Sequence, residues 1–156
     1  MIYGTINCLY YYYRFLSTSQ FVQGYKHQSG EVSKIPAGEI ENLIRTEIAD
    51  FLLERIKLAQ SYNIDRIIVD PGIGFGKTLD HNLTILRHLR LFRELGHPLL
   101  LGVSRKSFIG TLTNQTNPSD RLFGTAAACT IGVSKGVDIL RVHDPKAIKE
   151  VCAVAD

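Results

Sequence analysis

Hydrophobic residues along this chain gather in three short runs, and a polar cluster follows each run directly. The runs, each with the polar residue that follows it, are 67–69 before Asp70, 99–103 before Ser104, and 137–140 before Arg141. A stretch long enough for a helix separates each pair of runs, which is the pattern of repeated βα units. Strands of this almost wholly apolar kind are typical of a parallel sheet buried on both faces. Because ligands bind at the carboxyl ends of parallel strands, the pattern predicts a small-molecule site there.

The spacing of apolar residues predicts the individual elements. We expect helices at about 40–61, 80–95, 118–135 and 145–154. We expect strands at about 66–69, 99–103 and 137–142, a short apolar turn at 108–110 and a polar loop at 111–117. Asn117 followed by Pro118 predicts the start of the third helix, and Gly136 predicts its end. Small residues in this helix predict close approach to a neighbouring element: Gly124, Ala126, Ala127, Ala128 and Gly132.

Residues 1–37 differ in composition from the rest of the chain. Six of the seven tyrosines lie among the first 25 residues, and the only candidate element is a strand at about 6–15. We therefore expect a divergent or poorly ordered N-terminal segment at 1–37, followed by an α/β domain at 38–156. Three parallel strands do not close a barrel, since an eight-stranded barrel typically takes ~250 residues. The domain is expected to be either a small open sheet or one part of a larger fold.

Composition and charge narrow the possible functions. The 156 residues suffice for one domain with its own core, and 45% hydrophobic and 21% charged residues are ordinary for a globular protein. A formal net charge of +3 gives no indication of nucleic acid or a membrane surface as partner, although it suits an anionic small ligand. No apolar run approaches the ~20 residues of a membrane-spanning helix. Three widely separated cysteines favour reduced thiols in a cytoplasmic protein over disulfides or a zinc site.

The loop after the first strand is rich in glycine and begins with Asp70. Its Gly-Lys-Thr at 76–78 looks like a phosphate-binding loop, but the distance from Gly72 to Gly76 is one residue too short for that motif. A carboxylate held at a rigid turn can accept hydrogen bonds from adjacent N–H donors of a planar amino-heterocycle. Gly74 would let such a ring approach the backbone, and Phe75 would pack against it. The alternative is that Asp70 only caps the turn that follows it.

Cationic side chains follow the second and third strands. Arg105 offers a planar fork that suits a carboxylate, and Lys106 is a mobile donor to ring nitrogen or carbonyl groups; a solvated basic loop is the alternative. Arg141 and His143 lie two residues apart in an extended segment, so they share one face and form a candidate phosphate or pyrophosphate site. The alternative for His143 is a hydrogen bond with Asp144 in the core. No spacing among the histidines indicates a metal site.

Together these strand ends suit a transferase that joins an activated heterocycle to an aromatic acid, with a phosphate-type leaving group. Four motifs carrying this chemistry resemble the C-terminal half of the dihydropteroate synthase family: 70–77 with His81-Asn82, 102–110, 121–125 and 141–144. The resemblance extends from about Glu47 to the C-terminus, and the motifs have the family's order and spacing.

This resemblance implies a fold and a reaction. The family folds as a TIM (β/α)8 barrel, so we expect parallel βα units that form the C-terminal part of such a barrel, which is then incomplete in this chain. The family condenses 6-hydroxymethyl-7,8-dihydropterin pyrophosphate with para-aminobenzoate in folate biosynthesis, and sulfonamides compete for the para-aminobenzoate site. Pyrophosphate leaves first in this chemistry, and the arylamine then attacks the pterin-stabilised cation.

The resemblance also implies roles for individual residues. The implied substrate-binding residues are Asp70, Gly74, Phe75, Arg105, Lys106, Ser107, Arg141 and His143. The first strand end together with Lys106 would hold the pterin, Arg105 and Ser107 would serve para-aminobenzoate, and the third strand end would bind pyrophosphate. Lys106, Arg141 and His143 are the implied catalytic residues. Mg²⁺ is the implied cofactor, but the family's ligand for it, an Asn near the start of the barrel, has no matching motif here.

Three functional hypotheses follow. The first is a dihydropteroate synthase-like transferase, completed by a partner chain or a missing N-terminal half-barrel, with a homodimer as a further candidate assembly. The second is a non-catalytic half-barrel that binds only pterin or anions and leaves sheet edges exposed. The third is a methyltetrahydrofolate methyltransferase domain, which the pyrophosphate site argues against because a methyl donor needs none.

Overall fold

A computed structural model describes Asn42 and residues 47–156 of the chain. The expected strand at 6–15, the expected N-terminal segment at 1–37 and the start of the first expected helix lie outside the described residues. The expected division between 1–37 and 38–156 therefore stays a prediction.

The described strands are parallel, as predicted, and each is shorter than its apolar run. Strand β1 (Leu100–Leu101) pairs with β2 (Ile139–Leu140), and Val69 forms a single parallel bridge with Leu99 on the other side. One reason for the short pairing is that the Leu99 N–H donates to the Asp138 carboxylate, at 2.8 Å, instead of to a neighbouring strand. The three segments still lie side by side in chain order, so their carboxyl ends meet at one edge.

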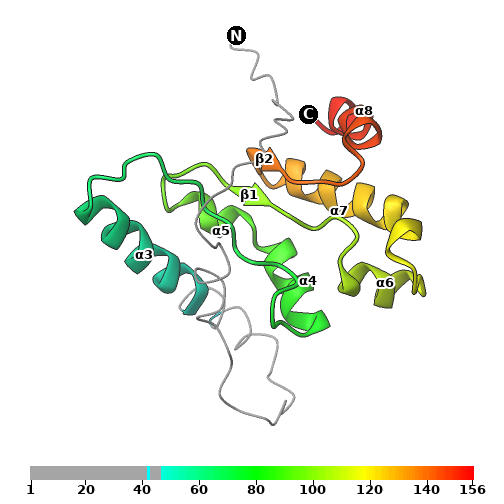
Figure 1. Ribbon diagram of the computed structural model, residues 1–156, viewed down its shortest axis with the longest axis horizontal. Coiled ribbons are helices and arrows are strands. Elements are labelled where there is room, and N and C mark those ends of the chain that lie inside the picture. Colours follow the sequence, from blue (N-terminus) through cyan, green and yellow to red (C-terminus); the bar gives the residue numbers. More distant parts are fainter. Residues whose placement is uncertain (1–41, 43–46) are drawn as a thin grey trace.

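Helix α3 precedes the first strand segment, and further helices follow each segment. Their bounds are α3 Ala49–Ser61, α4 Leu79–Arg87, α5 Arg90–Arg93, α6 Ser107–Thr113, the 3₁₀ helix η2 Pro118–Arg121, α7 Leu122–Ser134 and α8 Pro145–Ala155. The predicted ends near residue 61 and residue 135 and the final helix are confirmed. Figure 1 shows α7 and α8 packed next to each other on one side of the strands.

Two helix predictions were wrong in detail. The expected helix at 80–95 is interrupted after Arg87, because the chain tightens there into i→i+3 hydrogen bonds and so buries both Leu89 and Phe92 completely. The expected loop at 111–117 begins later than predicted, since α6 continues through Thr113. Asn114, in the left-handed conformation at φ 54°, ends that helix.

The start of the third predicted helix is confirmed at the level of atoms. The Asn117 side chain accepts a hydrogen bond from the Ser119 N–H at 3.2 Å, and Pro118 occupies the first helical position. The first turn is a 3₁₀ helix, after which α7 continues to Ser134. Gly136 has a φ of +85°, which confirms it as the residue that ends this helix.

The core lies between the strands and the helices that cover them. Close packing of α7 is confirmed, since a Cβ on Gly132 would lie 2.5 Å from Leu101 and a Cβ on Gly124 would lie 2.4 Å from Ile109. Among the described residues, no helix combines the length and the apolar composition needed to cross a bilayer.

Candidate active site

Asp70 ends the first strand segment and uses both of its carboxylate oxygens. Oδ1 accepts a hydrogen bond from the Gly72 N–H at 2.9 Å, so the turn-capping alternative is present. Oδ2 lies 3.6 Å from Nη2 of Arg141, which comes from the third strand end. The carboxylate is half-buried, and it therefore both shapes its own loop and faces the cation across the sheet edge.

Arg141 reaches Asp70 by passing over the middle strand. A Cβ added to Gly102 would lie 2.8 Å from Arg141 Nη2, so glycine at this position leaves the space that the guanidinium occupies. The alternation expected from an extended segment is visible here, because Arg141 and His143 are exposed while Val142 packs partly into the core.

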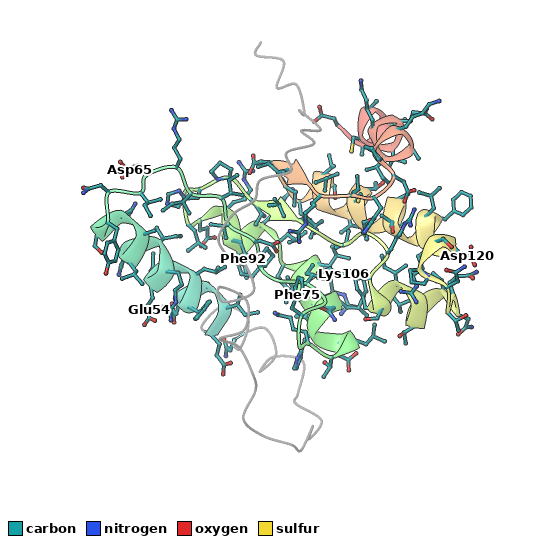
Figure 2. The ribbon with its side chains drawn as sticks, viewed as in Figure 1. Glu54, Asp65, Phe75, Phe92, Lys106 and Asp120 are labelled. Atoms are coloured by element: carbon teal, nitrogen blue, oxygen red, sulfur yellow. The ribbon has the colours of Figure 1, made fainter. Side chains whose placement is uncertain are left out.

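Lys106 is held by the glycine-rich loop of the first strand end. Its Nζ donates to the Ile73 carbonyl and lies 3.7 Å from the centroid of the Phe75 ring. Its stem crosses Gly74, where a Cβ would lie 2.3 Å from Lys106 Cδ and where the backbone has a φ of +81°. Figure 2 shows Phe75 and Lys106 next to each other. Glycine at this position is therefore required both by conformation and by the lysine above it.

Burial lowers the pKa of Lys106 to about 8. The nearby Asp70 carboxylate opposes this shift, whereas Arg141 and Lys77 add to it through like-charge repulsion. Lys77 is a cation that the sequence argument considered only as part of a phosphate loop. Its Nζ donates to the Gly72 carbonyl at 3.0 Å, and burial lowers its pKa as well. Three cations thus surround one carboxylate, which favours an anionic ligand.

Asn82 organises the glycine-rich loop from α4. Its Oδ1 accepts from the Gly74 N–H at 2.6 Å, and its Nδ2 donates to the carbonyls of Thr78 at 2.8 Å and Lys77 at 3.3 Å. The side chain is 3% exposed. Asn82 belongs to a motif noted in the sequence, but no role was predicted for it, because its partners are all backbone atoms that only the folded loop brings together.

Arg105 contacts a carboxylate of the chain itself. Its Nε and Nη2 donate to the two oxygens of Asp144, at 3.1 and 2.7 Å. This pair lowers the pKa of Asp144, chiefly through the hydrogen bonds from Arg105. Arg105 has a φ of 59°, which costs a non-glycine residue roughly 1–2 kcal/mol. The fork predicted for a ligand carboxylate is therefore directed at Asp144.

His143 and Ser107 complete the predicted set. The His143 ring Nδ1 lies 3.0 Å from Ser104 Oγ, and the His143 N–H donates to the same hydroxyl at 3.2 Å. The described hydrogen bonds of the Asp144 carboxylate come from Arg105 instead, so the suggested hydrogen bond between His143 and Asp144 is not among those described. Ser107 is the exposed first residue of α6.

The described part of the chain holds no group of three His, Cys, Asp or Glu side chains able to hold a metal ion. The arrangement instead brings a carboxylate, an ammonium and a guanidinium to one edge of a parallel sheet. These features define an α/β protein with a polar site at its strand ends, suited to a small ligand that has hydrogen-bond donors and an anionic group.

The family model of the pterin binding enzymes matches residues 22–143, and the chain belongs to this family. The match begins earlier in the chain than Glu47, where the motif resemblance starts. The family's relatives include dihydropteroate synthases, whose TIM barrel contains parallel βα units of the kind found here. The predicted fold class is thereby confirmed: these βα units form part of a TIM (β/α)8 barrel.

Three relatives illustrate the similarity. Dihydropteroate synthase of Synechocystis sp. is 46% identical over 112 residues, which cover 70% of this chain and 39% of the relative. The Thermus thermophilus dihydropteroate synthase, solved in complex with 4-aminobenzoate, is 43% identical with a TM-score of 0.69, over 72% of this chain and 44% of that chain. The Xanthomonas albilineans dihydropteroate synthase, in complex with 7,8-dihydropteroate, is 42% identical with a TM-score of 0.70, over 71% and 44%. The chain thus spans less than half the length of these relatives.

Proposed function

We propose that this chain provides part of the active site of a dihydropteroate synthase. The reaction is the condensation of 6-hydroxymethyl-7,8-dihydropterin pyrophosphate with para-aminobenzoate, which gives 7,8-dihydropteroate and pyrophosphate. The observation that carries the proposal is the convergence of Asp70, Lys106 and Arg141 from three strand ends. The ligands of the solved relatives, 4-aminobenzoate and 7,8-dihydropteroate, are the second substrate and the product of this reaction.

The pterin would lie between the first two strand ends. Asp70 is the acceptor for adjacent N–H donors of the ring, and Lys106 donates to a ring nitrogen or carbonyl. Gly74 and Phe75 form the wall beside the Lys106 side chain. Pyrophosphate would then face Arg141 and His143 at the third strand end, where two exposed donors are available.

Catalysis by these residues is electrostatic. The bond between the pterin methylene carbon and the pyrophosphate oxygen breaks, and its electron pair leaves with the oxygen. Arg141 and His143 stabilise the negative charge that develops on that oxygen. The nitrogen of para-aminobenzoate then attacks the methylene carbon, forms the new C–N bond and loses one proton to solvent. Lys106 keeps the pterin in place during both steps.

The para-aminobenzoate end is assigned to Ser107, with Arg105 behind it. Because Arg105 directs Nε and Nη2 at Asp144, the side of its guanidinium best suited to grip a carboxylate is already used. The exposed Ser107 hydroxyl, at the first position of α6, is a donor of the predicted set for which no hydrogen bond within the chain is described. Sulfonamides are expected to compete here.

Mg²⁺ does not fit the described residues, because the carboxylates at these strand ends, Asp70 and Asp144, are already paired with Arg141 and Arg105, and no three His, Cys, Asp or Glu side chains come together there. No step of the proposed reaction is therefore assigned to a metal held by this part of the chain. The expected Mg²⁺ ligand stays a prediction for a part of the barrel outside the described residues. A cytoplasmic location is part of the same proposal, in keeping with the buried thiols Cys129 and Cys152.

The rest of the barrel would pair with the outer edge of segment 66–69. Within the described residues, the backbone of Val69 pairs only toward Pro98, Leu99 and Leu100, and Ile68 beside it is 55% exposed. An unpaired edge next to an exposed isoleucine is suited to receive another parallel strand. We propose that this strand comes from an N-terminal half-barrel.

The experiment supplies that half-barrel as a separate chain from a bacterial relative. We expect the mixture to release pyrophosphate when both substrates are present, and Asp70→Ala to abolish the release. Light scattering on the same samples distinguishes the 1:1 complex from a homodimer of this chain. A well-formed complex that releases no pyrophosphate would refute the catalytic proposal.

A second candidate is a half-barrel that only binds pterin or an anion. The outer edge of segment 66–69 favours it, since no strand within the described residues covers that edge and Ile68 is exposed there. Calorimetry of the chain alone with a pterin tests this candidate: binding that is lost in Asp70→Ala supports it, and absence of binding excludes it.

A further inference from the structure

The segment 104–107 carries three predicted site residues on an unusual backbone. Arg105, in its middle, has a φ of 59°. A residue with a side chain stays in this region only when its surroundings fix it there. What fixes Arg105 therefore also determines where Lys106 and Ser107 point.

Arg121, the last residue of η2, holds the carbonyl of Arg105. Its Nη1 donates to the Arg105 carbonyl at 2.8 Å. Its other nitrogens bind a second loop: Nε donates to Gln115 O at 3.0 Å and Nη2 donates to Thr116 O at 2.7 Å. One guanidinium thus connects three backbone carbonyls on two loops, which requires the planar fork of arginine.

The neighbouring residues leave room for this clamp and complete it. A Cβ on Gly110 would lie 2.6 Å from Arg121 Nε and 2.6 Å from the Gln115 carbonyl, so α6 carries glycine where the guanidinium passes. On the amide side, the Arg105 N–H donates to Thr125 Oγ1 at 3.1 Å, and Thr125 is fully buried. Both backbone polar groups of Arg105 are therefore held by side chains of η2 and α7.

We propose that Arg121 is a positioning residue that acts through the Arg105 carbonyl to aim Lys106 and Ser107 into the site. The proposal rests on the proposed function for its ligands, and it adds a determinant of para-aminobenzoate binding that contacts no substrate. An Arg121→Lys substitution separates the effect of geometry from that of charge, because lysine keeps the positive charge but has no planar fork that could bind three carbonyls.

The experiment compares Arg121→Lys with Arg90→Lys in the chain as it exists. Arg90 is a matched control because it is an exposed arginine with one long hydrogen bond, from Nη2 to Ser134 O at 3.4 Å. Amide hydrogen exchange is followed at 105–111, and the Kd values for 4-aminobenzoate and for 6-hydroxymethyl-7,8-dihydropterin pyrophosphate are measured by calorimetry. Urea unfolding records the global stability of each variant.

We expect Arg121→Lys to speed exchange at 105–111 by about tenfold or more and to weaken 4-aminobenzoate by a similar factor. Arg90→Lys should change each quantity less than about twofold. An Arg121→Lys variant with unchanged local exchange and unchanged 4-aminobenzoate affinity overturns the proposal, as does a rise in exchange that is uniform over the described residues, which would show a loss of global stability in place of a local role. If the unaltered chain binds neither ligand on its own, the same Kd values are measured in its complex with the separate N-terminal half-barrel, and the exchange comparison decides independently whether Arg121 fixes the segment.

Discussion

The ammonium nitrogen of Lys106 lies 3.7 Å from the centroid of the Phe75 ring and donates a hydrogen bond to the Ile73 carbonyl beside it. The Lys106 side chain, from the second strand end, thereby holds the glycine-rich loop that follows the first strand segment. Cation–π contacts of this kind are worth from about 0.5 kcal/mol when exposed to about 2 kcal/mol when desolvated. The same contact keeps the ammonium near the Asp70 carboxylate and so prepares the site for a ring.

Pterin binding should depend on the charge of Lys106. The pKa of Lys106 is lowered to about 8, mainly by burial, so the charged form is lost as pH rises through that value. We expect the affinity for a pterin to fall above pH 8, measured by calorimetry. Lys106→Gln should bind more weakly and lose this pH dependence. The same decline in the variant would show that another group titrates.

The lowered pKa of Lys106 also predicts how the stability of the folded chain changes with pH. The folded chain releases the Lys106 proton at a lower pH than the unfolded chain, whose lysine pKa is 10.5. Between these two values the unfolded state binds more protons, so the contribution of Lys106 to the free energy of unfolding should rise with pH. Urea titrations of the unaltered chain and Lys106→Gln across this window measure the difference.

Gly74→Ala should destabilise the protein by more than the strain of a left-handed backbone, and it should also disrupt the site. Gly96 provides the matched control, because its φ of +75° is similar to the +81° of Gly74 but a Cβ there would meet nothing within 4 Å. Gly96→Ala should cost roughly 1–2 kcal/mol from the left-handed backbone alone. Gly74→Ala should cost more in urea unfolding and should also weaken pterin binding, because the new Cβ displaces Lys106. Equal losses in the two variants would show that the contact with Lys106 has no effect.

Gly102→Ala should affect anion binding more than stability. The added Cβ would meet the exposed Arg141 guanidinium, which can move, and the Arg141–Asp70 pair is worth only about 0–1 kcal/mol. Gly132→Ala is the contrasting variant, since its Cβ would meet Leu101 in the core and should cost about 1–3 kcal/mol. We expect pyrophosphate affinity to fall in the first variant and to persist in the folded fraction of the second. The reverse result would show that Arg141 does not contribute to anion binding.

Asn82→Ala should loosen the glycine-rich loop. The change leaves the Gly74 N–H and two carbonyls without their buried partner, which should lower the free energy of unfolding by roughly 2–3 kcal/mol. Thr84→Val, on the same helix, removes a single side-chain hydrogen bond to Asp80 O and should cost about 1 kcal/mol or less. Urea unfolding compares the two, and limited proteolysis should cut Asn82→Ala within 72–78. A loop as resistant as in the unaltered chain would contradict this role of Asn82.

Features of the fold that depend on local chemistry were predictable from the sequence. Asn117 with Pro118 starts a helix and Gly136 ends one, because caps need only neighbouring residues. The break after Arg87 was not predictable in this way. It shows only in the i→i+3 hydrogen bonds of the backbone, since the buried Leu89 and Phe92 have a spacing that also fits an unbroken helix.

The candidate site likewise has parts that the sequence predicts and parts that only the folded chain shows. The apolar runs placed Asp70 and Arg141 at one sheet edge, and the two side chains do lie together there. The choice of Asp144 as partner for Arg105 follows from a left-handed backbone that no sequence spacing indicates. Arg121 and Asn82 belong to motifs noted in the sequence, but no role was predicted for either, since they bind backbone carbonyls and amides rather than side chains. The ligand roles of the predicted residues stay predictions.

The pairing of Asp70 with Arg141 across Gly102 has a consequence for selectivity. Each charge is the other's partner in the absence of ligand, so a molecule that engages only one of them leaves its counterpart unmatched. A ligand with hydrogen-bond donors at one end and an anion at the other replaces both partners in a single exchange. The ion pair thus favours a molecule that carries both ends at the right separation, by no more than the roughly 0–1 kcal/mol that this exposed pair is worth.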